Sequence, residues 1–241
     1  MSAQPAIFEM LRSLPMFNGI SLSDLQQLVG EIPFHFEKFA PGELIIEARQ
    51  TNDLLRFILS GRAKAIIRNP TDRLRLSYIL EGPSVIAPDF VFGRNTHVPM
   101  RVEAETEVSV VSITKVDLLH LLTHSEIFLF NYLNIISAYA QKGIDGVISL
   151  TGGQLEERIA FWIIALTPVD AKEIELQSKH RDLYTLFGVQ RSSFISTLDT
   201  LKLHGLIDYD GRGIRVIDRK GLRDLLLSAS WSTHEDDPLL P

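Results

Sequence analysis

The chain has 241 residues, of which 45% are hydrophobic and 22% charged, an ordinary globular balance that suffices for two domains with separate cores. It contains no cysteine, which excludes disulfides, cysteine-ligated iron–sulfur clusters and cysteine zinc sites. No apolar run approaches the roughly 20 residues of a membrane-spanning helix, and residues 1–17 lack the pattern of an export signal. We therefore expect a cytoplasmic protein with no membrane partner.

The net charge of −6 hides a local asymmetry. Between Lys179 and Arg223 nine Lys and Arg residues face five acidic ones, a balance of +4, so the remainder carries −10. A basic C-terminal segment favours a polyanionic partner, because Lys and Arg gain affinity by releasing phosphate counterions. Ordinary scatter of surface charge is the alternative.

The first half of the chain predicts short helices followed by many strands. Apolar residues recur every three to four positions over roughly the first 25 residues, which is typical of helices. From Phe34 to about Ile113 short β-rich segments alternate with turns such as Pro41-Gly42 and Gly82-Pro83. This pattern predicts an antiparallel barrel, roll or sandwich. A helical pattern then runs from about Lys115 to about Leu150, with a break near Ser125.

Within that helical stretch apolar residues alternate at three- and four-residue spacing over about three heptads, which indicates a coiled-coil seam. We interpret the seam as a contact between two copies of the chain. Packing of the helix on its own barrel is the alternative, since Gly143 and Gly146 weaken the pattern. Two glycines between Leu150 and Gln154 predict a hinge before a second domain. The seam consists of Leu129, Leu133, Ile136, Ala140, Ile144 and Val147.

The second domain contains two short helices around a glycine turn. After a helix from Leu155 that ends at Thr167-Pro168, we predict helices from about Lys179 to Phe187 and from Gln190 to His204, with a sharp turn at Gly188-Val189. This is the helix-turn-helix pattern, whose second helix lies in the DNA major groove. Phe194, Leu198 and Leu201 fall on its inner face, whereas Arg191, Ser192, Ser196 and Thr200 fall mainly elsewhere. A solvated face of an ordinary helical hairpin is the alternative.

A hairpin is predicted directly after the second helix. Two short strands flank Asp210-Gly211, a strong hairpin pattern that would form the wing of a winged helix. Arg212 and Arg215 would lie near DNA phosphates, and Asp218 can cap a final short helix.

From about Phe17 to Leu227 the chain resembles the Crp/Fnr family of bacterial transcription regulators. The matching pieces, in order, are "FEKFAPGELIIE", "LLRFILSGRAKAI", "RVEAETEVSVVSI", "LEERIAFWIIAL" and "DLYTLFGVQRSSFISTLDTLKLHGLIDYDGRGIRVID". The resemblance implies an α+β fold with an N-terminal cyclic-nucleotide-binding-like antiparallel β-roll, flanking helices, a long dimerisation helix and a C-terminal winged helix-turn-helix. The expected domains are an effector-sensing roll (1–124), the dimerisation helix (125–150), the DNA-binding domain (151–228) and a disordered tail (229–241).

The resemblance also assigns DNA contacts. In the family the Arg after the turn, and the residues one and five positions further on, touch bases; here these are Arg191, Ser192 and Ser196. Family regulators that bind the cAMP-type half-site have Glu and Arg at the last two positions, so we expect a different operator. The family's phosphate-contacting segment matches the start of the preceding helix. The complete predicted set is Lys179, His180, Arg181, Gln190, Arg191, Ser192, Ser193, Ser196 and Arg212.

The sensor region departs from the family's cyclic-nucleotide binders, which use a Gly-Glu pair for the ribose and an Arg-Ser pair for the phosphate. Ala87-Pro88 fall near the first pair and Val98-Pro99 near the second, so the chemistry that binds cAMP is missing. Arg94 and Arg101 are candidate replacement cations. We expect no cAMP and an unknown small-molecule effector. The predicted pocket consists of Ala87, Pro88, Arg94, Val98, Pro99 and Arg101.

No pattern in the sequence predicts an enzyme or a metal site. His120 and His124 lie one helical turn apart but lack the Glu of a zinc-protease motif, so we interpret them as surface histidines. The leading hypothesis is a homodimeric, sequence-specific DNA-binding transcription regulator, with RNA polymerase as a partner implied by the resemblance. The rival is a small-molecule-binding or protein-interaction module whose helix-turn-helix is only a scaffold.

Overall fold

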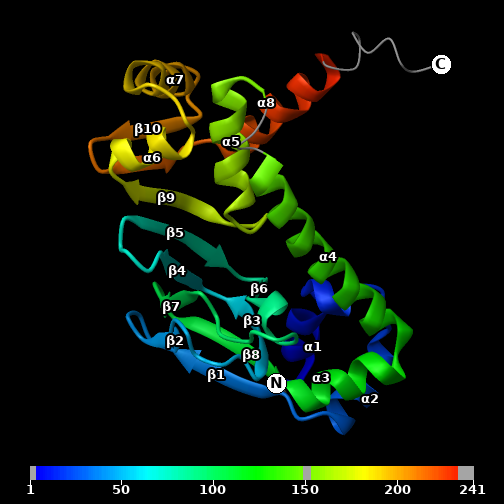
Figure 1. Cartoon of the computed structure of the whole chain (residues 1–241). Helices are drawn as coiled ribbons and strands as arrows, with labels where there is room; N and C mark the ends of the chain where they lie inside the picture. Colours follow the sequence, from blue (N-terminus) through cyan, green and yellow to red (C-terminus); the bar gives the residue numbers. More distant parts are fainter. Residues whose placement is uncertain (1–3, 149–152, 233–241) are drawn as a thin grey trace, which may run out of the picture. The chain divides into compact units, whose positions relative to one another are not determined.

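The computed structural model describes residues 4–148 and 153–232 (Figure 1). They form two compact units, one within residues 1–67 and 79–139 and the other within 68–78 and 140–241. The domain boundaries predicted from the sequence stay predictions. No helix in the described ranges is long and apolar enough to cross a membrane.

Short helices and the start of a long helix pack beside the roll of the first unit (Figure 1). The helix that begins at Lys115 ends at His124, and the next begins at Glu126, so the break predicted near Ser125 is confirmed. Thr114 caps the first of these helices, because its Oγ1 accepts a hydrogen bond from the Asp117 amide at 3.1 Å. The elements are α1 (Gln4–Arg12), η1 (Pro15–Phe17), α2 (Leu22–Glu31), α3 (Lys115–His124) and α4 (Glu126–Ile148).

The first sheet of the roll has the antiparallel strand order β1-β8-β3-β6. Phe57 lies opposite Val111 and Val85, and these side chains face the helices. There Phe57 joins an aromatic cluster around Phe17, whose ring centroid lies 6.2 Å from that of Phe57 and 5.5 Å from that of Phe128. The strands are β1 (His35–Phe39), β3 (Leu54–Ser60), β6 (Ser84–Ile86) and β8 (Val108–Thr114).

The second sheet of the roll places small and apolar residues on its buried face. β7 pairs with β2 on one side and β4 on the other, both antiparallel, and Ala63 lies opposite Ala104. Both alanines are buried, as is Val102. The predicted antiparallel roll is confirmed, although β1 and β6 were not among the segments singled out in the sequence. The strands are β2 (Leu44–Ile46), β4 (Arg62–Arg68) and β7 (Met100–Ala104), and a 3₁₀ turn, η2 (Pro88–Phe90), follows β6. Strand β5 (Leu74–Glu81) is divided between the two units.

The second unit is a winged helix-turn-helix with an additional strand. β9 pairs with β11, which pairs with β10, all antiparallel. The sequence analysis missed β9, although its buried residues Ile174, Leu176 and Ser178 alternate along the strand as a half-buried strand requires. The elements are α5 (Leu155–Ala165), β9 (Lys172–Ser178), α6 (His180–Leu186), α7 (Arg191–Leu203), β10 (Ile207–Asp210), β11 (Gly213–Val216) and α8 (Arg219–Ser232).

Two expectations concern the ends of these elements. Asp218 caps α8 as predicted, since its Oδ1 accepts a hydrogen bond from the Gly221 amide at 2.9 Å. The helix continues to Ser232, which is four residues into the tail expected to be disordered; residues 233–241 lie outside the described ranges. Residues 150–152 of the predicted hinge also lie outside them.

The turn between β3 and β4 generates a stability prediction. Gly61 has a φ of +91°, and a Cβ there would lie 2.1 Å from the Glu107 carbonyl oxygen. Gly61→Ala is expected to lower the unfolding free energy by about 3 kcal/mol or more, because backbone atoms must move. Gly42 is the matched control, with a φ of +87° and open space around its Cβ position. Gly42→Ala should cost only about 1–2 kcal/mol. Urea unfolding followed by circular dichroism measures both, and equal losses would contradict the steric explanation.

Candidate nucleic-acid interface and effector region

The turn between α6 and α7 is fixed by Gly188. This glycine has a φ of +66°, in the left-handed region that favours glycine. Its amide donates to the Thr185 carbonyl at 3.2 Å, and the Val189 amide donates to the Tyr184 carbonyl at 3.0 Å. These two bonds form a Schellman motif, which ends α6 and redirects the chain. The sharp turn predicted at Gly188-Val189 is therefore present.

The inner face of α7 holds the helix in place. Phe194, Leu198 and Leu201 are each 0% exposed, as the spacing of apolar residues predicts. The Phe194 ring stacks on Phe187 at 6.2 Å, and Phe187 meets Trp162 edge to face at 5.5 Å. Burial of one apolar face stabilises a helix whose Ser and Thr residues give it low intrinsic propensity.

The outer face of α7 gathers the residues predicted to contact bases. A shallow hollow in this face is lined by Arg191, Ser192, Ile195, Ser196 and Asp199. All except Ile195 are exposed, and Arg191 makes no ion pair with any described residue. Gln190 and Ser193, beside the hollow, are exposed as well. The sequence analysis missed Asp199, although its position three residues after Ser196 would place the two side chains on the same face.

Three further cations predicted to contact DNA are exposed. Lys179 is the residue that caps α6, and Arg181 lies in its first turn. Arg212 lies at the tip of the wing, where the Asp210 carboxylate accepts hydrogen bonds from the Arg212 and Gly213 amides at 2.7 and 3.2 Å. The Arg212 carbonyl in turn accepts from the Ser178 amide at 3.0 Å, which brings the wing tip beside Lys179. None of the three cations forms an ion pair with another residue of the described ranges.

Two residues of this region have structural partners instead. His180 is half-buried and packs with ring centroids 6.1 Å from Phe194 and 5.8 Å from Tyr209, so its ring supports α7 from behind. Arg215, expected near phosphates, donates to Glu175 on β9 at 3.1 Å. That ion pair reduces its availability for a phosphate.

Strand β10 of the wing is bonded to α7 through Tyr209. The phenol donates to Asp199 Oδ1 at 2.5 Å, and this hydrogen bond, more than burial, raises the pKa of Tyr209 to about 12. Lys202 lies over the same ring at 5.6 Å and pairs with Asp208 at 2.7 Å. The pair raises the pKa of Lys202 and lowers that of Asp208. The hydrogen bond also fixes the Asp199 carboxylate on the outer face of α7.

The structure separates the residues of the predicted effector pocket. Ala87, Pro88 and Val98 are buried, and Ala87 has a left-handed backbone with a φ of 46° and a ψ of 51°. Arg94 and Pro99 are exposed. The candidate replacement cations therefore do not converge with the buried residues.

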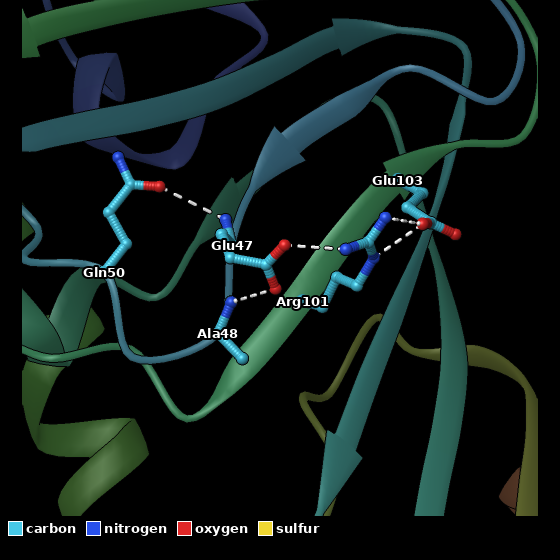
Figure 2. Close-up of polar contacts among 5 residues, drawn as sticks. All are labelled: Glu47, Ala48, Gln50, Arg101 and Glu103. Atoms are coloured by element: carbon cyan, nitrogen blue, oxygen red, sulfur yellow. Dashed lines mark hydrogen bonds and ion pairs between the residues drawn. The ribbon is translucent and has the colours of Figure 1, made fainter.

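Arg101 points to the outer face of its sheet and is engaged by two carboxylates (Figure 2). Its neighbours Met100 and Val102 on β7 are buried, so the alternation of the strand turns Arg101 outward. The guanidinium donates to Glu47 at 2.6 Å through Nη1 and to Glu103 at 2.6 Å through Nε. The hydrogen bond with Glu103 is the main cause of a raised pKa of Arg101. A phosphate would have to compete with both carboxylates.

The predicted seam residues on α4 differ in exposure. Leu129 and Leu133 are 40% and 52% exposed, and Ala140 is also exposed. Ile136 is half-buried and packs against the helical core of its own unit, as the alternative interpretation requires at that position. Ile144 and Val147 lie in α4, but their side chains are outside the part of the structure that is described.

Metal coordination has no candidate in the described residues. The rings of His120 and His124 on α3 lie in tilted contact, with centroids 4.0 Å apart and an angle of 33° between their planes. Within residues 4–148 and 153–232 no group of three or more His, Asp or Glu side chains could hold a metal ion.

Comparisons with known proteins agree with this architecture. Residues 157–225 match the model of the Crp-like helix-turn-helix domain. A search of curated proteins finds no match. Among solved structures, the catabolite activator protein of Thermus thermophilus is 14% identical, with a TM-score of 0.50 over 89% of this chain and 99% of that one. CooA from Carboxydothermus hydrogenoformans (14% identity, TM-score 0.49, 89% and 95% covered) and DNR from Pseudomonas aeruginosa (18%, 0.45, 93% and 99%) are also similar.

A β-roll followed by a Crp-like helix-turn-helix domain defines a class of DNA-binding transcription regulators. Residues 157–225 of this chain are such a helix-turn-helix domain, and the whole chain has the fold of the catabolite activator protein, a fold shared with Crp/Fnr regulators. The resemblance described from the sequence is thus confirmed in its fold and in its DNA-binding domain, whereas the individual contact residues stay predictions.

The contact between Tyr209 and Asp199 generates a pH prediction. Tyr209→Phe should lower the unfolding free energy by about 1 kcal/mol at neutral pH. Because the folded-state pKa lies above the usual value of about 10, the hydrogen bond contributes fully below pH 10 and is lost as the pH rises towards 12. The wild type and the variant should therefore converge in that window. Urea unfolding at a series of pH values measures this, with Tyr184→Phe as control. A difference that persists unchanged above pH 11 would contradict the role of the phenol proton.

Proposed function

We propose that the protein is a homodimeric, sequence-specific transcription regulator whose DNA affinity is controlled by an effector bound in the roll, and that it acts by binding rather than by catalysis. The observation that carries the proposal is the division of α7 into two faces. Its inner face is fully buried, and its outer face presents an Arg without an acidic ion-pair partner in the described ranges together with two exposed serines. Such a helix suits the major groove, where Arg pairs with guanine and hydroxyls reach base edges.

The exposed cations suggest a division of labour on DNA. Arg191, Ser192 and Ser196 line the hollow on α7 and would read bases. Lys179, Arg181 and Arg212 lie at the start of α6 and at the wing tip, where Lys and Arg would neutralise phosphates without reading sequence. Gln190 and Ser193 would contact the backbone or base edges beside them.

Asp199 adds a negative element to the reading face. Its carboxylate accepts hydrogen bonds only, so it would favour a cytosine amino group and oppose a close phosphate. Because Tyr209 holds one of its oxygens, the carboxylate is not free to turn away. We propose that Asp199 contributes to the choice of operator sequence.

A two-fold dimer would present two copies of α7 to neighbouring major grooves. Leu129 and Leu133 support α4 as the contact, because both are large apolar side chains that the single chain leaves substantially exposed. Two half-sites separated by about one DNA turn, roughly 34–36 Å, would follow from this symmetry.

Two substitutions test the roles on DNA. Arg191→Ala should lose about 1–3 kcal/mol of binding to the preferred sequence and relax the preference at one base position. Lys179→Ala should weaken all sequences about equally and reduce the salt dependence by about one phosphate contact. Selection from a random duplex library, followed by affinity measurements at two salt concentrations, separates the two effects.

Lys64→Ala is the control for the DNA measurements, since it removes one positive charge from the roll. It should change neither the preferred sequence nor the affinity beyond about twofold. Equal, sequence-independent losses from Arg191→Ala and Lys179→Ala would refute the base-reading role, and the absence of any selected motif would refute sequence-specific binding.

The dimer contact has its own test. Leu133→Glu places a charge in the proposed apolar seam and should convert the dimer to monomers at micromolar concentration, as measured by analytical ultracentrifugation. Asn134→Glu adds the same charge at the next exposed position, off the seam, and should leave the dimer intact. Identical sedimentation of the wild type and Leu133→Glu would place the dimer contact elsewhere.

A further inference from the structure

The hollow on the outer face of α7 contains one apolar side chain. Ile195 lines it together with two charged residues and two serines. Ile195 is half-buried, whereas Phe194 beside it and Leu198 three residues later are fully buried. It therefore lies on the flank of the buried face and keeps part of its side chain at the surface of the hollow. The proposed contacts with bases and phosphates do not use this residue.

Along the helix, Ile195 stands between two residues of opposite charge. Arg191 precedes it by four residues and Asp199 follows it by four, so the three side chains form one row with Cβ atoms about 5–6 Å apart. Ser192 and Ser196 belong to the neighbouring row. An apolar contact at Ile195 would thus have polar contacts on both sides, and these would fix which base pair it meets.

The position of Ile195 in α7 suits a contact with a base. The residue lies in the second turn of a helix that runs from Arg191 to Leu203. In a helix-turn-helix the N-terminal residues of the second helix contact base edges. Each Cα–Cβ bond of a helix tilts towards its N-terminus, so the Ile195 side chain leans towards that end. Its apolar group consequently lies in the part of α7 that would face the bases.

Isoleucine is an unfavourable choice for helix stability at this position. Side chains that branch at Cβ lower helix propensity, and α7 already contains many Ser and Thr residues. Since Ile195 stays partly exposed, core packing compensates for only part of this loss. The same branching restricts χ1 to one main rotamer in a helix. The methyl groups are therefore presented rigidly, and little side-chain entropy is lost when they meet a partner.

The major groove offers one apolar group that matches such a side chain. Base edges there present hydrogen-bond donors and acceptors, apart from the C5-methyl group of thymine. 5-Methylcytosine carries the same methyl group at the same ring position. A cytosine amino group or a guanine oxygen placed against Ile195 would lose its water without gaining a hydrogen bond, which is unfavourable. Ile195 therefore favours a pyrimidine with a C5-methyl group.

We propose that Ile195 is a specificity-determining residue that recognises the C5-methyl group of a pyrimidine, thymine or 5-methylcytosine, in the major groove of the operator. This assignment rests on the proposed function, because α7 must enter the groove. It adds a contact of different chemistry to the hydrogen bonds expected from Arg191, Ser192 and Ser196. Recognition of a methyl group depends on the exclusion of water rather than on a donor or an acceptor.

Replacement of thymine by uracil tests the contact, because it removes only the methyl group and leaves every hydrogen-bonding group in place. The preferred operator is first selected with the full-length protein from a random library of unmodified duplexes, and each thymine is then replaced in turn. Replacement of one thymine per half-site should weaken wild-type binding about three- to fivefold, the factor expected for the loss of one buried methyl group. Fluorescence anisotropy of labelled duplexes measures the affinities.

Cytosine methylation forms the second arm and distinguishes the two sources of the methyl group. A selected motif in which a thymine shows the uracil effect identifies thymine as the partner. A motif in which methylation of one cytosine at C5 strengthens binding about three- to fivefold identifies 5-methylcytosine. Either result supports the assignment of Ile195, provided that the effect depends on this residue.

Ile195→Ala tests that dependence. The variant should bind the preferred operator about three- to fivefold more weakly and should no longer distinguish the methylated base from the unmethylated one. Because the ratio of the two affinities is measured within one variant, a general change in the stability of α7 cancels from it. Ile195→Val keeps a branched apolar side chain and should retain the preference for the methylated base.

Leu203→Ala is the matched control. It removes an apolar side chain that is 85% exposed at the last residue of the same helix, two turns beyond Ile195. Its affinity and its preference for the methylated base should equal those of the wild type within about twofold, because the two sites are distant from each other.

Two results would overturn the inference. One is a selected motif in which neither uracil nor 5-methylcytosine changes the affinity of the wild type. The other is a methyl effect that persists unchanged in Ile195→Ala, since another residue would then contact the methyl group. Both results would leave sequence-specific binding intact, whereas the absence of any selected motif would count against the proposed function and this inference together.

Discussion

The burial of one side of α7 is the constraint on which the DNA-binding unit depends. A helix with so many Ser and Thr residues has little intrinsic stability, so its position comes from Phe194, Leu198 and Leu201 in the core. The Schellman turn at Gly188 fixes where the helix begins, and the hydrogen bond between Tyr209 and Asp199 fixes its outer flank to the wing. The buried face, the N-terminal turn and the contact with the wing all restrain α7. The helix therefore presents its exposed polar groups in a defined arrangement, and little further conformational entropy is lost when it binds DNA.

In the roll, the alternation of side chains along each strand fixes the face of the sheet on which a residue lies. A side chain on β3 or β7 faces either the interior or the opposite side, and a shift of one residue reverses its environment. Arg101 follows a buried Met and precedes a buried Val, so it is outside and pairs with carboxylates. Arg56 alternates with Leu55 and Phe57, which face the helices, and it is therefore inside. Position along the strand, more than residue type, decides the environment of each Arg.

The sequence predicted the helix-turn-helix, the wing hairpin and most strands of the roll, because each has a local cause: apolar spacing, a glycine turn or an Asp-Gly pair. It did not predict β9, a short strand between two helices, or the three-residue β6. The sequence also did not predict features that depend on contacts between distant parts of the chain. Arg56 lies about thirty residues before the segment considered for effector binding, and only the pairing of β3 with β6 and β8 brings it beside Ser84 and Ser112. The ion pairs of Arg101 likewise join residues far apart in the chain.

In both units the Lys and Arg side chains fall into two groups, those that contact a carboxylate of the protein and those that do not. Lys202, Arg215 and Arg101 each contact a carboxylate, and each helps to hold neighbouring elements together. Arg191 and Arg56 have no such partner among the described residues. For the exposed Arg191 this costs little, since water solvates it until a phosphate or guanine arrives. Arg56 is 9% exposed and donates one hydrogen bond to Asn52, and burial lowers its pKa. An exposed Arg without a carboxylate partner thus suits the reading surface of α7, where its charge stays available for DNA.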